Sequence, residues 1–300
     1  MPCIEARGLR KAFGTTIALD GIDLRVEEGR ILGLIGPNGA GKTTALNAIL
    51  GLIPYEGQLR VLGRDPWVER ERLMTDVSFI ADVAVLPRWI RVSDALDYVA
   101  GVHPRFDRAK AEGFLGKTTI KHSSRVRELS KGMVAQLHLA LVMAVDARLL
   151  VLDEPTLGLD ILYRKQFYGS LINDYYDRSR TIIVTTHQVE EIQHVITDLM
   201  FIDRGRIVYG CNMEEFETRY AEVIVKPDRL DAARVLKPMH ERQVLGRSIL
   251  LFDGADRQQL SALGEVHTPS IADLFVAVIG NQTKGPQSAY VQSNLQGVSR

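Results

Sequence analysis

Cysteine is scarce in this sequence, and neither sign of charge is in excess. The two cysteines among 300 residues, Cys3 and Cys211, are too few and too far apart for a disulfide framework or a metal-ligand pattern. We therefore expect ordinary thiols in a reducing compartment. Lysine plus arginine and aspartate plus glutamate both number 37, so no net charge favours nucleic acid, anionic lipid or an acidic substrate. We expect no nucleic-acid partner.

A hydrophobic run long enough to cross a membrane is also missing. The most apolar stretch, Leu139 to Leu152, includes Asp146 and Arg148, and a membrane-spanning helix needs about 20 apolar residues. Charged residues interrupt the N-terminus from Glu5 onward, which speaks against a secretory signal. We expect a cytoplasmic chain that does not span a membrane by itself.

What the sequence does contain is an alternation of buried strands and helices. The runs Ile31–Ile35, Leu149–Leu152 and Thr181–Thr186 lack polar–apolar alternation, as expected for strands covered on both faces. Helical stretches separate them, which predicts an α/β fold with a parallel sheet flanked by helices. Short alternating runs between Ile4 and Gly36 predict further strands and turns at the N-terminus.

The remaining segments suggest appended or inserted parts. Residues from about 66 to 147 look mostly helical, with Ser93-Asp94 and Asp107 as candidate caps. After Gly210 the periodicity fades; residues 221–280 hold two strand-like runs (222–225 and 248–252) and one helix candidate (270–279), which predicts a small accessory unit. Residues 281–300 are polar and suggest a flexible tail. No internal repeat is visible, so we expect any ligand-binding motif to occur once per chain.

The segment from Gly36 to Thr43 (GPNGAGKT) is the most specific motif. It fits G-x-x-x-x-G-K-[ST], follows a buried strand and begins a helix. The alternative, a glycine-rich turn that binds no ligand, is therefore disfavoured. Backbone N–H groups would surround phosphate oxygens, Lys42 would bring a charge to the outer phosphates, and Thr43 would offer its hydroxyl to Mg²⁺. As a surface feature, the loop should tolerate Lys42→Ala without loss of fold. The predicted ATP-binding residues here are Gly36, Pro37, Asn38, Gly39, Ala40, Gly41, Lys42, Thr43 and Thr44.

Two adjacent carboxylates end the strand that begins at Leu149. Parallel sheets of this kind bind ligands at the carboxyl edge, where Asp153 and Glu154 are expected to lie. Neighbouring strand residues face opposite sides, so the two acids can serve different purposes. Asp153 would hold the magnesium shell, and Glu154 would orient and polarise the attacking water. The alternative, two acids that merely end a strand, is weak beside a phosphate loop.

A third segment, Leu129 to Met133 (LSKGM), precedes the carboxylate strand. Alone it is weak evidence, and its plain interpretation is a helix N-cap by Ser130. With the three motifs in this order, however, the sequence resembles the nucleotide-binding subunits of ABC transporters over residues from about 4 to 220. LSKGM then corresponds to the signature loop of that family. The resemblance implies a P-loop NTPase sheet with an N-terminal antiparallel β subdomain and an inserted helical subdomain.

The resemblance assigns roles to further residues. Phe13 matches the aromatic residue that stacks on adenine, although by type it would more often belong to a core. Thr156 to Asp160 (TLGLD) matches the D-loop, whose plain interpretation is a turn after Pro155. His187 matches the switch histidine that contacts the terminal phosphate. The implied set is Glu154 and His187 for catalysis, with Phe13, Ser130, Lys131, Gly132, Met133 and Asp160 at the nucleotide.

Two chains are expected to act together. In the family, two subunits meet head to tail, and each phosphate loop is capped by the signature loop of the partner. Ser130 and the backbone of Gly132 would then donate to the partner's γ-phosphate from a helix N-terminus. Because one chain has one set of motifs, hydrolysis would require a dimer, with a homodimer as the simplest form.

Several positions depart from the family pattern. Asp82 stands where the family usually has glutamine, so its contact to magnesium is in doubt, although a carboxylate could still reach the ion. Lys131, Met133 and Leu157 replace a usual glycine, glutamine and serine, as in several bacterial exporter ATPases. The candidate metal ligands are Thr43, Asp153 and Asp82.

A transporter subunit without a membrane span needs separate integral membrane permease subunits and would lie peripherally on the inner face of the membrane. The apolar segment Val83–Trp89 could dock such a partner or be buried in the helical block. Thr268–Phe275 resembles a segment that closes many bacterial drug- and lipid-export ATPases, which favours export. The alternatives are a soluble ABC ATPase in translation or DNA repair, which usually has two ATPase domains or a long coiled coil, and a small-molecule P-loop kinase.

Overall fold

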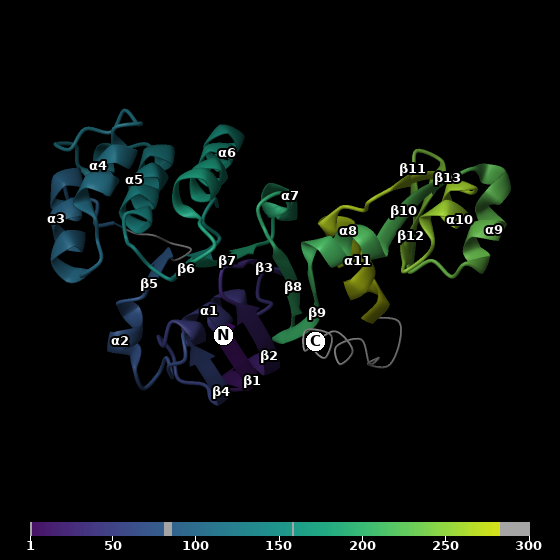
Figure 1. Ribbon diagram of the computed structural model, residues 1–300, viewed down its shortest axis with the longest axis horizontal. Helices are drawn as coiled ribbons and strands as arrows, with labels where there is room; N and C mark the ends of the chain where they lie inside the picture. The colour runs from purple at the N-terminus through teal and green to yellow at the C-terminus, as the bar shows by residue number, and fades with distance from the viewer. Residues whose placement is uncertain (1, 81–85, 158, 283–300) are drawn as a thin grey trace. The chain divides into compact units, whose positions relative to one another are not determined.

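The computed structural model describes residues 2–80, 86–157 and 159–282. The chain forms two compact units (Figure 1). Unit 1 comprises Met1–Ile196 and Ile202–Ile207, and unit 2 comprises Thr197–Phe201 and Val208–Arg300. The boundary between the two units therefore lies within residues 197–208. The sequence suggested that the accessory region begins later, at residue 221.

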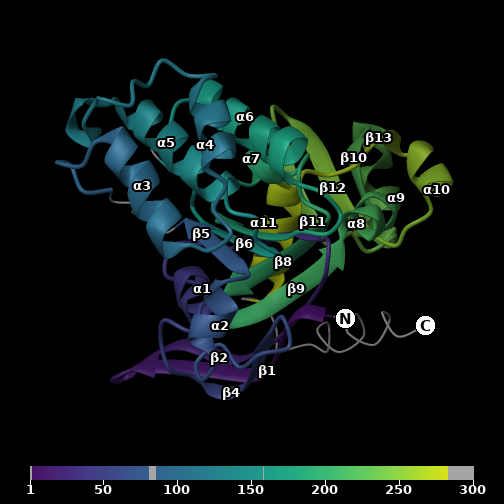
Figure 2. The same ribbon diagram turned by 60° about the vertical axis from the view of Figure 1, so that its left-hand side comes forward.

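Unit 1 begins with an antiparallel sheet. Strand β1 (Pro2–Phe13) lies between β2 (Thr16–Glu27) and β4 (Glu56–Val61). In β2, Ile22, Leu24 and Val26 are buried and the residues between them are exposed, which is the alternation of a sheet with one covered face. Figure 2 shows the three strands as a layer of their own below α1 and α2.

A second sheet has six strands in the order β5-β6-β7-β3-β8-β9. Every residue of β3, β6 and β7 is buried, which confirms the predicted α/β fold. Parallel pairing places Asp153 opposite Thr185 and Ile35 opposite Thr186, so β3, β6 and β7 end at the same edge. The strands are β3 (Ile31–Ile35), β5 (Val77–Ile80), β6 (Leu149–Asp153), β7 (Thr181–Thr186), β8 (Asp198–Asp203) and β9 (Arg206–Asn212).

Helices surround this sheet, and three of them (α3, α4 and α5) share a core of their own. Strand β5 lies within the interval 66–147 that was expected to be mostly helical; it is a buried strand that pairs with β6. Asp107 caps α4 as expected, whereas Ser93 and Asp94 lie inside the first turn of α3. The helices are α1 (Lys42–Ile49), α2 (Arg70–Met74), α3 (Val92–Val102), α4 (Arg108–Leu115), α5 (Lys131–Met143), α6 (Ile161–Ser170) and α7 (Val189–Ile192), with single turns at Val126–Glu128 and Leu171–Tyr175.

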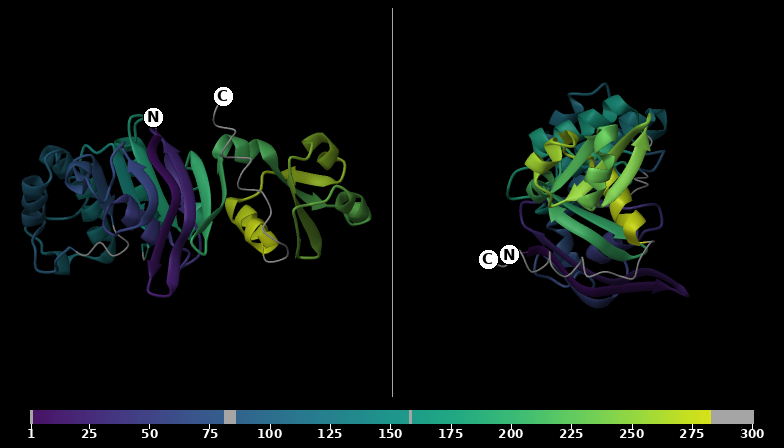
Figure 3. Two further views of the ribbon diagram at one scale, coloured as in Figure 1. Left: turned by 90° about the horizontal axis from the view of Figure 1, so that it is seen from below. Right: turned by 90° about the vertical axis from the view of Figure 1, so that its right-hand side faces the viewer.

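Unit 2 contains a small antiparallel sheet in the order β11-β12-β10-β13. Figure 3 shows this sheet and the yellow helix α11 from two further sides. In the described ranges of both units, no helix combines the length and apolar character needed to cross a bilayer. The elements are α8 (Met213–Arg219), β10 (Tyr220–Val225), α9 (Leu230–Val235), β11 (His240–Val244), β12 (Arg247–Asp253), α10 (Arg257–Ser261), β13 (Gly264–His267) and α11 (Ile271–Gln282), with a turn at Pro227–Arg229.

Candidate functional site

The glycine-rich loop joins β3 to α1, as the motif requires. Glycine is needed where the loop passes close to other backbone: a Cβ at Gly36 would lie 2.2 Å from the carbonyl oxygen of Ile202. Gly41 has a φ of 109°, and a Cβ there would lie 2.6 Å from the carbonyl oxygen of Ala18. The first N–H groups of α1, from Lys42 onward, have no partner within the helix. They form a site for an anion such as phosphate.

Lys42 holds its charge inside this loop. Its side chain is only 6% exposed, and Nζ donates to the carbonyl oxygens of Gly36 (2.8 Å) and Pro37 (3.3 Å). Nζ also lies 3.3 Å from Oε1 of Glu154. The structure thus brings together the two residues that the sequence assigned to phosphate binding and to water activation.

Glu154 lies in an unusual backbone conformation. Its φ is 45°, a left-handed value that costs a non-glycine residue about 1 to 2 kcal/mol, and its N–H donates to the carbonyl oxygen (3.2 Å) and Oγ1 (3.1 Å) of Thr185. The resulting turn places Oε2 2.9 Å from Nδ1 of His187. The ion pair with Lys42 lacks hydrogen-bond geometry, so Oε1 is buried without a donor. Such an acceptor suits a water molecule awaiting activation.

Asp153 ends β6 and is buried at the same edge. Its Oδ1 accepts a hydrogen bond from Oγ1 of Thr185 at 2.5 Å. The sequence analysis did not single out Thr185, although a hydroxyl residue at the end of a buried strand is a usable signal. Thr185 therefore orients Asp153 and supports the backbone of Glu154.

The donor set fits magnesium. Among the described residues, no group of three or more His, Cys, Asp and Glu side chains could hold a metal ion. Magnesium needs no such group, because it takes one or two carboxylates together with waters and substrate phosphates. Asp153 and the exposed hydroxyl residue Thr43 can supply two such ligands. Asp82, the third predicted ligand, lies outside the described residues.

Phe13 occupies the end of β1. Its side chain is 53% exposed, and Nζ of Lys11 lies 5.1 Å from the ring centroid. The residue is therefore not part of a core, and its ring is accessible to a planar base.

The signature and D-loop residues lie apart from the cluster around Lys42. Ser130 caps α5, accepting from the N–H of Met133 at 3.2 Å, and Met133 packs partly against the helical core. Lys131 is exposed. Asp160 caps α6 by accepting from the N–H of Tyr163 at 3.0 Å, and Gly158 is outside the described residues. Within the described parts of one chain, Ser130, Lys131, Met133 and Asp160 make no hydrogen bond or ion pair with Lys42, Glu154 or His187. The N–H of Leu157 in the D-loop, by contrast, donates to the carbonyl oxygen of Glu154 at 3.0 Å.

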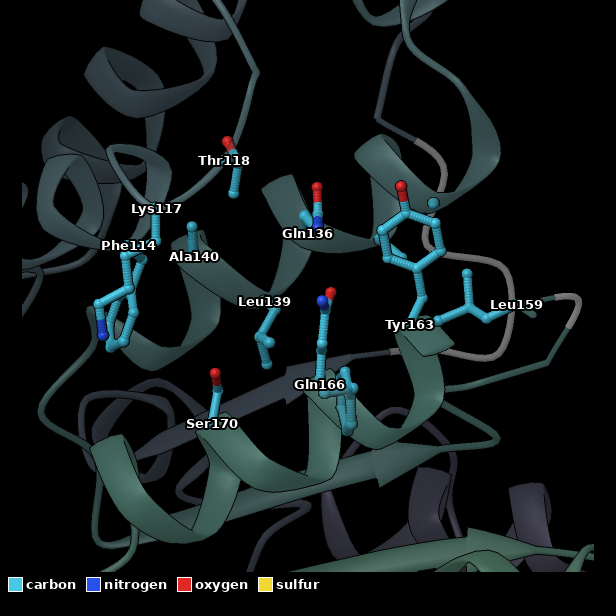
Figure 4. A pocket seen from close by; sticks show the side chains of 13 residues that line it. Phe114, Lys117, Thr118, Gln136, Leu139, Ala140, Leu159, Tyr163, Gln166 and Ser170 are labelled. Carbon is cyan, nitrogen blue, oxygen red and sulfur yellow. The ribbon is translucent and has the colours of Figure 1, made fainter. Parts of the chain in front are cut away.

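A cavity of about 270 Å³ lies between α4, α5 and α6 (Figure 4). It does not include the phosphate-loop cluster, so it is not the ATP site. On one side, the ring of Tyr163 closes over Gly132: a Cβ there would lie 2.8 Å from the ring. The lining residues are Phe114, Lys117, Thr118, Gly132, Ala135, Gln136, Leu139, Ala140, Leu159, Tyr163, Gln166, Phe167 and Ser170.

Gly132→Ala is expected to destabilise the protein. The added methyl would collide with Tyr163, and overpacking costs about 1 to 3 kcal/mol. Gly113→Ala on α4 is the matched control: no atom lies near its Cβ position, so it should gain up to about 1 kcal/mol. Urea unfolding of both variants, and of Gly132→Ala with Tyr163→Ala, measures this. Equal stability of Gly132→Ala and wild type would contradict the contact.

Comparisons with known proteins agree with this geometry. The chain matches the family described as "ABC transporter" over residues 19–157. It is 31% identical to the Nod factor export ATP-binding protein I of Cupriavidus pinatubonensis, covering 94% of this chain and 92% of the relative. It is 30% identical to the daunorubicin resistance ATP-binding protein DrrA3 of Streptomyces coeruleorubidus, covering 95% and 98%.

Solved structures show the same fold. The ATP-binding subunit of an ABC transporter aligns with a TM-score of 0.65 at 22% identity, covering 72% of this chain and 92% of that chain. A nucleotide-free ATP-binding cassette from an ABC transporter aligns with a TM-score of 0.62 at 19% identity, covering 71% and 92%.

Proposed function

The chain belongs to the ATP-binding subunits of the ABC transporter family, and we propose that its Lys42, Glu154 and His187 hydrolyse ATP to drive export through separate membrane subunits. The observation that supports this most is their convergence: one carboxylate lies 3.3 Å from Lys42 Nζ and 2.9 Å from His187 Nδ1. The three residues come from three distant parts of the sequence. If the Lys42–Glu154 ion pair served only stability, it would not need the contact with His187, nor a Glu154 Oε1 that is buried without a hydrogen-bond donor.

Each side chain has a chemical task in this proposal. The N–H groups that begin α1 and the Lys42 ammonium hold the β and γ phosphates. Asp153 and Thr43 would hold Mg²⁺, which when bound would neutralise charge that develops on the phosphates. Glu154 orients the water and accepts its proton. His187, hydrogen-bonded to Glu154, fixes that carboxylate and faces the terminal phosphate.

A second copy of the chain completes the site in the proposed dimer. Ser130 and the Gly132 backbone would reach the γ-phosphate bound by the partner. Large apolar side chains are exposed in the D-loop and directly after it: Leu157 (53%), Ile161 (73%) and Leu162 (64%). Exposure of adjacent apolar residues is typical of a surface that another protein covers, which supports a subunit interface here.

Membrane subunits would dock on the helical block. Of the proposed docking segment Val83–Trp89, residues 83–85 lie outside the described residues, but Trp89 is 68% exposed. Leu86 of the same segment packs partly against the core of the helical block, so the support for docking comes from Trp89. The names of the two relatives given above concern Nod factor export and daunorubicin resistance, which supports export. The chain would then lie on the cytoplasmic face of the membrane, held there by its partner.

Trp89→Glu is expected to release the chain from membranes without loss of ATP binding. A charge at the docking surface opposes burial against the partner, so the membrane-bound fraction should fall about 10-fold or more. Trp67→Glu is the matched control, because Trp67 is also exposed (50%). The measurement is the amount of chain in membranes from cells that express its neighbouring genes, with nucleotide binding assayed in parallel. Undiminished membrane association of Trp89→Glu would refute this docking surface.

A further inference from the structure

Arg164 of α6 links two loops that flank the site. Its Nε donates to the carbonyl oxygen of Leu159 at 2.6 Å, and its Nη1 donates to Gln188 Oε1 and to Glu191 Oε1. The second oxygen of Glu191 accepts from Oγ1 of Thr156 at 3.0 Å. The cluster therefore joins both ends of the D-loop to α7 and to the residue that follows the switch histidine.

This cluster is shielded from solvent. The side chains of Arg164 and Glu191 are 23% and 17% exposed, so their attraction is screened less than that of a surface pair. Tyr168 closes one side, with its hydroxyl 3.5 Å from Oγ1 of Thr156. Burial raises the pKa of Tyr168, so its hydroxyl stays neutral.

The chain positions of these residues connect the cluster to the catalytic pair. Thr156 is two residues after Glu154, and Gln188 directly follows His187. The N–H of Gln188 also donates to Oγ1 of Thr186 at 2.9 Å, so the backbone on both sides of His187 is held. A contact that only packed α6 against α7 would not explain the bond from Arg164 to Leu159 in the D-loop.

We propose that Arg164 and Glu191 are positioning residues that hold His187 at hydrogen-bond distance from Glu154 and make that distance depend on the D-loop. The inference rests on the proposed ATP hydrolysis. Because the D-loop faces the second copy in the proposed dimer, a shift of Leu159 on dimerisation moves Arg164 and, through Glu191 and Gln188, the switch histidine. Hydrolysis is thereby coupled to the arrival of the partner subunit.

The test compares Arg164→Met, Glu191→Gln and their combination in the full-length chain. We expect kcat to fall about 10- to 100-fold, since small misplacements of catalytic groups cost about that much, while KM changes less than about 2-fold. The kcat of the double variant should be no lower than that of the slower single variant, because each single substitution already removes the same interaction between Arg164 and Glu191. Arg164→Lys, which keeps the charge but not the planar fork, should retain an intermediate kcat.

Arg64→Met is the matched control. Arg64 pairs with Asp76 at 2.8 Å, with side-chain exposures of 33% and 7%. Asp76 directly precedes β5, so it lies at the amino ends of the parallel strands, away from the carboxyl ends where Asp153 lies. The control should lose comparable thermal stability and keep its kcat. A wild-type kcat in Arg164→Met would overturn the inference. A loss of activity in that variant that is no larger than its unfolded fraction explains would overturn it as well.

A second measurement separates this inference from the proposed function. If wild type hydrolyses no more ATP than Lys42→Ala, the proposed function fails. Even if the proposed function fails in this way, the ¹⁵N NMR signals of the His187 ring still report whether His187 contacts Glu154. They should shift in Arg164→Met and Glu191→Gln and remain unchanged in Arg64→Met. Unchanged His187 signals in all variants would refute the positioning role whatever the ATPase result.

Discussion

Glu154→Gln is expected to slow ATP hydrolysis by about 10² to 10⁴-fold, the usual contribution of a general base, while ATP binding persists. The amide is nearly isosteric with the carboxylate but cannot accept a proton from water. The structure sharpens this expectation, because the carboxylate lies between Lys42 Nζ and His187 Nδ1. The variant loses the charge that pairs with Lys42, which leaves that ammonium free for the phosphates.

The same variant should accumulate as an ATP-bound dimer. Hydrolysis no longer ends the closed state, and one negative charge fewer per site reduces repulsion toward the γ-phosphate. Light scattering with ATP and Mg²⁺ would compare wild type, Glu154→Gln and Glu154→Gln combined with Ser130→Arg. The side chain of arginine should block the signature loop at the N-terminus of α5. Wild-type turnover by Glu154→Gln, or equal dimerisation of the double variant, would show the assignment to be wrong.

Lys42→Ala should abolish measurable ATPase activity and weaken ATP binding. Removing the ammonium takes away the point charge on the β and γ phosphates. The expectation that this loop is only a surface feature is wrong for Lys42, which is 6% exposed and donates to two loop carbonyls. Leaving these two acceptors without their donor costs about 1 to 3 kcal/mol, so the melting temperature should also fall.

The control for this prediction is Lys165→Ala. Lys165 lies on α6 and is exposed, so its removal should change neither turnover nor stability by more than about 0.5 kcal/mol. Phosphate release and thermal melting with and without ATP measure both effects. Normal turnover of Lys42→Ala would remove this lysine from the proposed mechanism.

Local signals were sufficient to predict the sheet and the main candidate residues. The strands that end at Ile35, Asp153 and Thr186 are buried along their whole length, and their sequences lack the polar–apolar alternation of a half-buried strand, a pattern that depends on neighbouring residues only. Each is followed by a polar group that a parallel sheet must bring to one edge. The approach of Lys42 to Glu154 could therefore be anticipated from the buried strands, whereas the place of the histidine followed from the resemblance to the family.

The accessory unit was less predictable from its sequence. Strands β10 and β12 carry buried apolar residues and were predicted, whereas β11 (HERQV) and β13 (GEVH) were not. The missed strands lie at the two edges of the sheet. Edge strands with exposed, charged side chains lack an apolar pattern, and only pairing with the inner strands reveals them.

The sequence by itself determined the phosphate loop, the strand that ends in two carboxylates, and their order along the chain. Only the tertiary structure decided which side chains support them: Thr185 beneath Asp153, Tyr163 over Gly132, and Arg164 between the D-loop and Glu191. These contacts join residues that are 5 to 32 positions apart in sequence. Their side chains meet because parallel strands and packed helices set the distances between backbones, a quantity that no local pattern encodes.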